Sequence, residues 1–108
     1  MRALAVLMLL AACGGSDIGD CPTASESTQL EGRAVMQRSC ATCHNAQQTG
    51  AGRAGAPFEV NFDTAAGVQA QRLNAWDEAS SGSMPPVMTL NAADLEKLRV
   101  YLACGATQ

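Results

Sequence analysis

The five-residue run Cys40-Ala41-Thr42-Cys43-His44 constrains this chain more than any other feature. Cys-x-x-Cys-His is the attachment signature of a covalently bound c-type haem. Two thiols at this spacing can each form a thioether with a vinyl group on one edge of the porphyrin, while the imidazole that follows ligates the iron. The motif therefore predicts a protein built around one haem c, attached through Cys40 and Cys43, with His44 as an iron ligand.

Two other kinds of site also use a Cys-x-x-Cys pair. The pair can act as a dithiol in thiol–disulfide exchange, or it can form half of a zinc site. No run of β-branched and apolar residues precedes Cys40, so the βαβ pattern of a redox dithiol is missing. Cys43 and His44 are adjacent and would have to converge on one tetrahedral ion, and His44 is the only histidine. Haem attachment is therefore the favoured interpretation.

The N-terminus predicts secretion. Residues 1–12 contain one basic residue, an apolar run and two small residues before Cys13, which is typical of a signal peptide. The apolar run is too short to span a membrane, which needs about 20 apolar residues. Leu10-Ala11-Ala12-Cys13 resembles the lipobox of bacterial lipoproteins, in which the cysteine is diacylated and becomes the first mature residue. The alternative is an ordinary signal peptide with a chance cysteine beyond its cleavage site.

These features divide the chain into three parts. We expect a lipoprotein signal peptide at 1–12, a lipidated tether at 13–27 that is rich in Gly, Ser, Thr and Asp, and a folded domain at 28–108. Acyl chains on Cys13 would hold the protein on a membrane surface outside the cytoplasm, facing the periplasm. Gly14 after the cysteine resembles the sorting signal for the outer membrane.

Composition limits the mature part to one domain, and nothing in it suggests nucleic-acid binding. Six basic and ten acidic side chains remain after residues 1–12 are removed, a formal charge of −4. Only four residues of the chain are aromatic, so a domain of this size has few large side chains with which to build a core. A haem would supply the missing apolar bulk.

The first two helices are predicted from caps and apolar spacing. Thr28-x-x-Glu31 has capping-box spacing, so we expect a helix to start at Thr28 and run into Cys40. Residues 47–57 hold three glycines and end in a proline, and are expected to form a loop. A second helix is expected from Thr64, as its cap, to Ser80. The residues expected to face inward are Leu30, Ala34 and Val35 in the first helix, and Val68, Leu73 and Trp76 in the second.

The last helix has the clearest pattern. Asn91 is a good N-cap, Asp94 lies at N3 near the positive end of the helix dipole, and Gly105 is placed as the C-terminal stop. Its apolar stripe is Leu95, Leu98 and Leu102. No segment alternates with period two, so we expect an all-α domain of three to four helices wrapped around the haem.

A methionine is the expected ligand on the other face of the iron. The segment 81–86 places Met84 in a loop whose glycine allows close approach and whose prolines stiffen the chain. A neutral thioether favours Fe(II) relative to a second imidazole and raises the reduction potential. Met88, Met36 and an open site are the alternatives, and Met36 precedes Cys40 by one turn, where packing is its expected role.

Taken together, these motifs resemble the small class I c-type cytochromes, and the match covers Thr28 to Gly105. The resemblance implies that the carbonyl of Pro57 accepts a hydrogen bond from the ligand histidine and fixes its tautomer. It also implies that Trp76 packs near the haem or its propionates, the alternative being a core tryptophan. Arg72 could pair with a propionate, or be solvated.

The resemblance also suggests a role for the last two cysteines. In class I cytochromes the terminal helices cross, which would bring Cys21 and Cys104 near each other, and an oxidising compartment would favour a disulfide between them. Two free thiols or an intermolecular bond are the alternatives.

The function predicted from the sequence is single-electron transfer between larger redox proteins, by a monomeric, membrane-tethered monohaem cytochrome that is not itself an enzyme. The chain has no second histidine for acid–base work at neutral pH, and no small-molecule substrate is expected. The alternatives are a haem-based sensor of small ligands and a haem subunit of a larger oxidoreductase.

Overall fold

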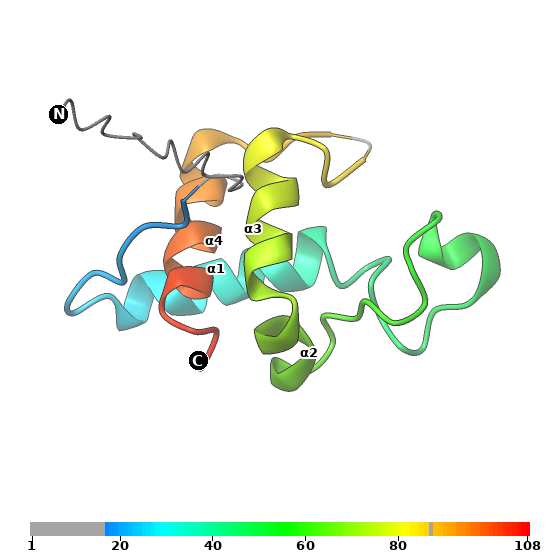
Figure 1. The fold of residues 1–108 in the computed structure, drawn as a ribbon, viewed down its shortest axis with the longest axis horizontal. Coiled ribbons are helices and arrows are strands. Elements are labelled where there is room, and N and C mark those ends of the chain that lie inside the picture. The colour runs from blue at the N-terminus through cyan, green and yellow to red at the C-terminus, as the bar shows by residue number, and fades with distance from the viewer. Residues whose placement is uncertain (1–16, 87) are drawn as a thin grey trace, which may run out of the picture.

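A computed structural model describes residues 17–86 and 88–108 (Figure 1). Its elements are α1 (Glu26–Ser39), η1 (Gly50–Arg53), α2 (Ala65–Ala70), α3 (Arg72–Ser81) and α4 (Ala92–Ala103). No strand occurs among these residues, so the all-α expectation is confirmed. The predicted signal peptide and Cys13 lie outside the described residues. No helix in the described part of the chain is both long enough and apolar enough to span a membrane.

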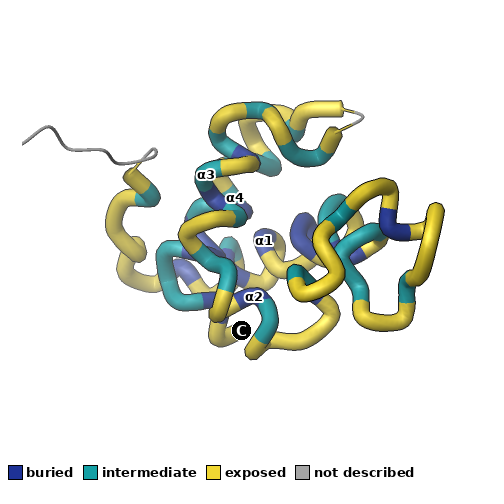
Figure 2. Tube along the Cα trace, turned by 45° about the vertical axis from the view of Figure 1, so that its right-hand side comes forward, coloured by how far each residue is buried: buried dark blue, intermediate teal, exposed yellow. Residues whose placement is uncertain are grey.

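The core forms where α1 crosses α4, with α3 alongside α4 (Figures 1 and 2). The crossing is close because Gly32 lies at the contact. A Cβ there would overlap the carbonyl oxygen of Lys97 and lie 2.6 Å from the Cβ of Tyr101. The most deeply buried side chains surround this point. They are Val35, Met36, Leu98 and Leu102, each at most 1% exposed.

Helix α1 differs from expectation in both its start and its inner face. It begins at Glu26, two residues before Thr28, and its N-cap is Ser25. The Ser25 hydroxyl donates to the carbonyl of Pro22 (2.7 Å) and makes no cap bond. The buried positions of α1 are Gln29, Gly32, Val35 and Met36. Of the three residues expected to face inward only Val35 does, because the crossing at Gly32 sets the inner face and leaves Ala34 exposed and Leu30 52% exposed.

The single helix expected from Thr64 to Ser80 is two helices. Its start is as predicted, since the Thr64 hydroxyl accepts a hydrogen bond from the Gly67 N–H (3.1 Å). At Gln71 the N–H turns back to the Val68 carbonyl (3.2 Å), which ends α2, and α3 follows. Val68 and Trp76 are buried as expected, whereas Leu73 is 56% exposed. No glycine or proline marks the break, so no local signal predicts it.

Helix α4 agrees with its predicted pattern. The Asn91 side-chain oxygen accepts from the Asp94 N–H (2.8 Å), which caps the first turn. Leu98 and Leu102 are buried, and Leu95 is partly buried against the core. Gly105 has a φ of 87°, and beyond it the Ala106 N–H returns to the Tyr101 carbonyl (3.0 Å), which ends the helix.

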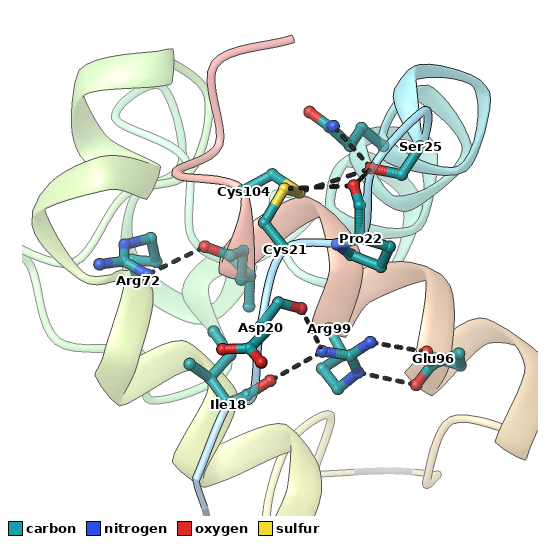
Figure 3. Close-up of a disulfide and its surroundings, with 11 residues drawn as sticks. Ile18, Asp20, Cys21, Pro22, Ser25, Arg72, Glu96, Arg99 and Cys104 are labelled. Carbon is teal, nitrogen blue, oxygen red and sulfur yellow. Dashed lines mark hydrogen bonds and ion pairs between the residues drawn. A yellow bond between two sulfur atoms is a disulfide. The ribbon is translucent and has the colours of Figure 1, made fainter.

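The segment before α1 is bound to α4 (Figure 3). Cys21 and Cys104 form a disulfide with Cα atoms 4.8 Å apart. The Arg99 guanidinium donates to the carbonyls of Ile18 (2.9 Å) and Asp20 (3.1 Å) and pairs with Glu96. The segment from Ile18 to Cys21, which lies within the expected tether, therefore contacts the folded domain. The division into signal peptide, tether and domain stays a prediction.

Candidate functional site

A largely apolar cavity of about 940 Å³ lies between the end of α1, the loop that follows it, α3 and the loop from α3 to α4. Cys40, Cys43, His44 and Met84 all line this cavity. Two segments that are 40 residues apart in the chain thus bring the predicted attachment residues and the predicted methionine to one place.

The Cys-x-x-Cys-His motif forms a tight turn at the end of α1. The N–H groups of Cys40 and Ala41 both donate to the Met36 carbonyl (3.0 Å each), which closes the helix. The N–H groups of Cys43 and His44 then turn back to the Cys40 carbonyl, at 3.3 Å and 3.0 Å. One turn of backbone therefore presents both thiols and the imidazole to the same cavity.

His44 is held by two contacts to the segment after the loop. Its Nδ1 lies 3.0 Å from the Val60 carbonyl oxygen, and its own carbonyl accepts from the Phe62 N–H at 2.7 Å. A carbonyl oxygen can only accept, so Nδ1 carries the proton and the lone pair of Nε2 is free for a metal. The Phe62 ring, 5.0 Å from the imidazole centroid, packs beside it.

Pro57 does not accept this hydrogen bond, which corrects the role implied by resemblance. Its carbonyl oxygen accepts instead from the Val60 N–H (3.1 Å) and from Arg53 (2.6 Å). The Val60 N–H closes a four-residue turn on Pro57, so the Pro57 carbonyl is used inside the turn and the carbonyl of Val60 meets His44. Pro57 still lines the cavity.

Met84 is held in its loop by backbone and side-chain contacts. Gly82, at a φ of 81°, ends α3, and the Met84 N–H donates to the Glu78 carbonyl (3.1 Å). The Ser83 hydroxyl also donates to the Glu78 carboxylate. Met88 lines the cavity too but is 72% exposed, whereas Met36 is 1% exposed and is not among the cavity-lining residues.

Helix α3 forms another wall of the cavity. Its lining positions follow helical spacing, and the small side chains of Ala75 and Ala79 leave room for a flat ring beside the helix. Trp76 is one position away, is 7% exposed and does not line the cavity, and its indole N–H has no hydrogen-bond partner among the described residues. Arg72 donates to the Leu102 carbonyl (3.1 Å) and does not line the cavity either.

The Cys40 thiol and the surrounding side chains favour haem attachment over a reactive dithiol or a zinc site. Burial raises the pKa of the Cys40 thiol to about 11, so it stays protonated at neutral pH. Reactive dithiols instead have a lowered thiol pKa and present a thiolate. Within residues 17–86 and 88–108, no group of three or more His, Cys, Asp and Glu side chains could hold a metal ion. A zinc site would need three or four such ligands.

The residues present fit a covalently bound haem. The cavity is lined by two thiols three residues apart, an imidazole with a free Nε2, a thioether from a second segment and the small side chains of α3. Residues 27–102, well over half of the chain, match the family described as cytochrome c oxidase, cbb3-type, subunit III. The chain belongs to this family. It is therefore a small c-type cytochrome, and its cofactor is covalently bound haem c.

Membership also places the protein in a functional class. A c-type cytochrome domain serves haem-based electron transfer, its partners are redox proteins, and such domains are typically extracytoplasmic. No curated protein and no solved structure matches this cytochrome.

Sequence reasoning missed two residues of the site. Val60 carries the carbonyl that meets His44, and any residue type can supply a carbonyl, so its side chain gives no signal. Arg53 is 6% exposed in a loop that is otherwise largely exposed (Figure 2). A charged residue between glycines usually predicts a solvated position. The three glycines around Arg53 predicted a loop, but they gave no sign that the loop buries the Arg53 guanidinium.

Proposed function

We propose that this cytochrome carries single electrons between larger redox proteins, with its haem attached to Cys40 and Cys43 and its iron ligated by His44 and Met84. The observation that carries the proposal is that these four side chains line one cavity. His44 has its Nδ1 on a backbone carbonyl, which leaves Nε2 as the ligand atom. Met84 comes from a separate loop, so two segments would supply the two axial ligands.

This ligand pair suits electron transfer better than ligand binding. Imidazole and thioether together leave no open position on the iron, and the soft sulfur favours Fe(II) and raises the reduction potential. The protein contributes a backbone partner for the His44 imidazole and a largely apolar cavity. Neither contribution requires a bound substrate.

Tethering to a membrane is part of the proposal. The lipobox-like run ending at Cys13 and the signal-like residues 1–12 support a lipid anchor on the periplasmic side, with the outer membrane favoured by Gly14. Because the chain contacts α4 from Ile18 onward, the free tether between lipid and domain would be short. The mass of the mature N-terminal peptide tests this, since diacylation adds a defined mass to Cys13.

A second candidate is a haem subunit of a larger oxidoreductase. The description of the matched family, a subunit of an oxidase, favours it. The two candidates share the same haem chemistry and differ in assembly. Extraction from membranes in mild detergent distinguishes them, because a free carrier migrates as a single chain and a subunit migrates with the complex.

Optical spectra test the ligand assignment. We expect the ferric protein to be low-spin with a methionine charge-transfer band, and the ferrous protein not to bind CO. Met84→Ala should abolish the band, lower the reduction potential and allow CO to bind. Met88→Ala is the matched control, because Met88 lines the same cavity from the same loop and should leave the spectra unchanged. A high-spin ferric spectrum and ready CO binding in the unaltered protein would favour the sensor alternative instead.

A further inference from the structure

Arg53 is the one charged side chain among the buried residues of the described chain. It lies at the end of η1, in the loop that forms one wall of the haem cavity, and is 6% exposed. A buried charge is costly unless its hydrogen-bonding groups are satisfied. Its surroundings therefore have to be organised around the guanidinium.

The guanidinium is satisfied by neutral oxygens. Nη1 donates to the Asn45 carbonyl (2.8 Å) and to the side-chain oxygen of Asn61 (3.0 Å), and Nη2 donates to the Pro57 carbonyl (2.6 Å). The exposed Phe58 ring covers it, with the guanidinium carbon 5.7 Å from the ring centroid. None of these partners is a carboxylate, so the positive charge is solvated by dipoles and is not neutralised.

One of its partners links Arg53 to the ligand histidine. Nη2 also donates to the Val60 carbonyl (3.2 Å), the same oxygen that meets His44 Nδ1 at 3.0 Å. Two donors, one of them a cation, thus share a single acceptor. Arg53 also donates to the Pro57 carbonyl, which accepts the Val60 N–H and so closes the turn from Pro57 to Val60. Arg53 therefore contacts both ends of the turn that presents the Val60 carbonyl to His44.

We propose that Arg53 is a positioning residue that fixes His44 through the Val60 carbonyl and raises the reduction potential of the haem. The inference rests on His44 being an iron ligand, as in the proposed function. A carbonyl that already accepts a bond from a cation is a weaker acceptor for the imidazole N–H. The imidazole then keeps its proton more fully and donates less electron density, which favours Fe(II). The buried positive charge disfavours Fe(III) in the same sense.

The test compares reduction potentials of the holo-protein across four variants. Arg53→Met removes the charge and the bond to Val60, and should lower the equilibrium constant for reduction by about tenfold, which is about 59 mV for one electron. Arg53→Lys keeps the positive charge but loses the several N–H donors of the guanidinium, and should lower the equilibrium constant for reduction by less than tenfold. If Arg53→Met fails to fold, Arg53→Lys provides the test. A lower reduction potential in Arg53→Lys, with the methionine band retained, supports the role of Arg53, and an unchanged potential overturns it.

Two controls separate this effect from loop disorder and from net charge. Asn61→Ala removes two hydrogen bonds in the same cluster but leaves both donors on Val60, so it tests loosening of the loop alone. Arg33→Met removes one positive charge from an exposed position of α1 that lines a different cavity. Both should change the equilibrium constant by less than threefold.

The outcomes are distinct. A potential unchanged in Arg53→Met, or lowered equally by Asn61→Ala or Arg33→Met, overturns the role of Arg53. In these cases the methionine band and the lack of CO binding in the parent protein leave the proposed function standing. If the parent is high-spin and binds CO, electron transfer through His/Met ligation fails, while the difference in potential between parent and Arg53→Met still decides the role of Arg53.

Discussion

At the scale of single residues, the helix caps and the candidate site each depend on one polar or sulfur atom of a side chain. Thr64 and Asn91 cap their helices as expected because a hydroxyl or amide oxygen next to free N–H groups has one strongly favoured partner. Cys40, Cys43, His44 and Met84 line one cavity, and each carries an atom that can bond a haem. The acceptor for His44 was missed because it is a backbone carbonyl, and the choice between Pro57 and Val60 depends on how one turn closes.

Tyr101 provides a residue-scale prediction of pH dependence. Burial raises the pKa of its phenol, against a smaller opposing effect of Arg33. The folded protein therefore holds this proton to higher pH than the unfolded chain, so the free energy of unfolding should fall as pH rises above about 10, by at most about 1.4 kcal/mol per pH unit for one proton. Urea unfolding of the holo-protein between pH 8 and pH 11 measures this.

Tyr101→Phe is the matched variant, because it removes the phenol proton and keeps the ring. Its stability should decline less steeply above about pH 10 than that of the parent, while the two profiles run parallel below. Equal slopes in the two proteins would mean that Tyr101 titrates as it does in the unfolded chain.

At the scale of the helices, the sequence predicted α1, α4 and a helical stretch from Thr64, but not which face of α1 is buried or where that stretch divides. In α4 the predicted Leu98 and Leu102 are buried, but Val100 and Tyr101 are buried as well, so the helix buries more than the predicted stripe. In α1 the apolar residues are spread around the helix, so the inner face is chosen by the helix that crosses it, and Gly32 lies there in place of Leu30. The break at Gln71 has the same origin, since tertiary packing decides it and no residue marks it.

Gly32 supports a prediction about the α1–α4 crossing. Gly32→Ala adds a methyl group that overlaps the backbone of Lys97, which cannot move aside as a flexible side chain would. The helices must separate, and we expect a loss of roughly 1–3 kcal/mol in the free energy of unfolding. This outweighs the gain of up to about 1 kcal/mol in helix propensity. Denaturant unfolding of the holo-protein gives the value.

The control for this variant is Ala34→Leu on the same helix. Ala34 is exposed, so a larger side chain there extends into solvent and should change stability by less than about 0.5 kcal/mol. If Gly32→Ala were as stable as the parent, the close approach of the two helices would not be a constraint on this fold.

At the scale of the whole molecule, the two ends of the domain are joined next to each other. The Cys21–Cys104 disulfide links residues 83 apart in sequence, and Arg99 holds the same N-terminal segment on α4 (Figure 3). A cross-link over a loop of this length stabilises mainly by restricting the unfolded chain, by about 4 kcal/mol in the chain-entropy model. The two hydrogen bonds from Arg99 to backbone carbonyls act only in the folded state and should each contribute about 1 kcal/mol.

These two contributions can be separated by variants in protein that also carries Cys13→Ser. The unfolded, unreduced holo-protein should show no reactive thiol, and reduction should release two. Replacing Cys21 and Cys104 together by Ser should cost about 4 kcal/mol, and Arg99→Met, which keeps the disulfide, about 1–2 kcal/mol. Two reactive thiols before reduction would exclude the bond. The disulfide is expected to act on the unfolded chain, whereas the Arg99 hydrogen bonds act only in the folded state. If the Cys21→Ser, Cys104→Ser protein is as stable as Arg99→Met or more so, the disulfide contributes little and the Arg99 hydrogen bonds hold the two ends together.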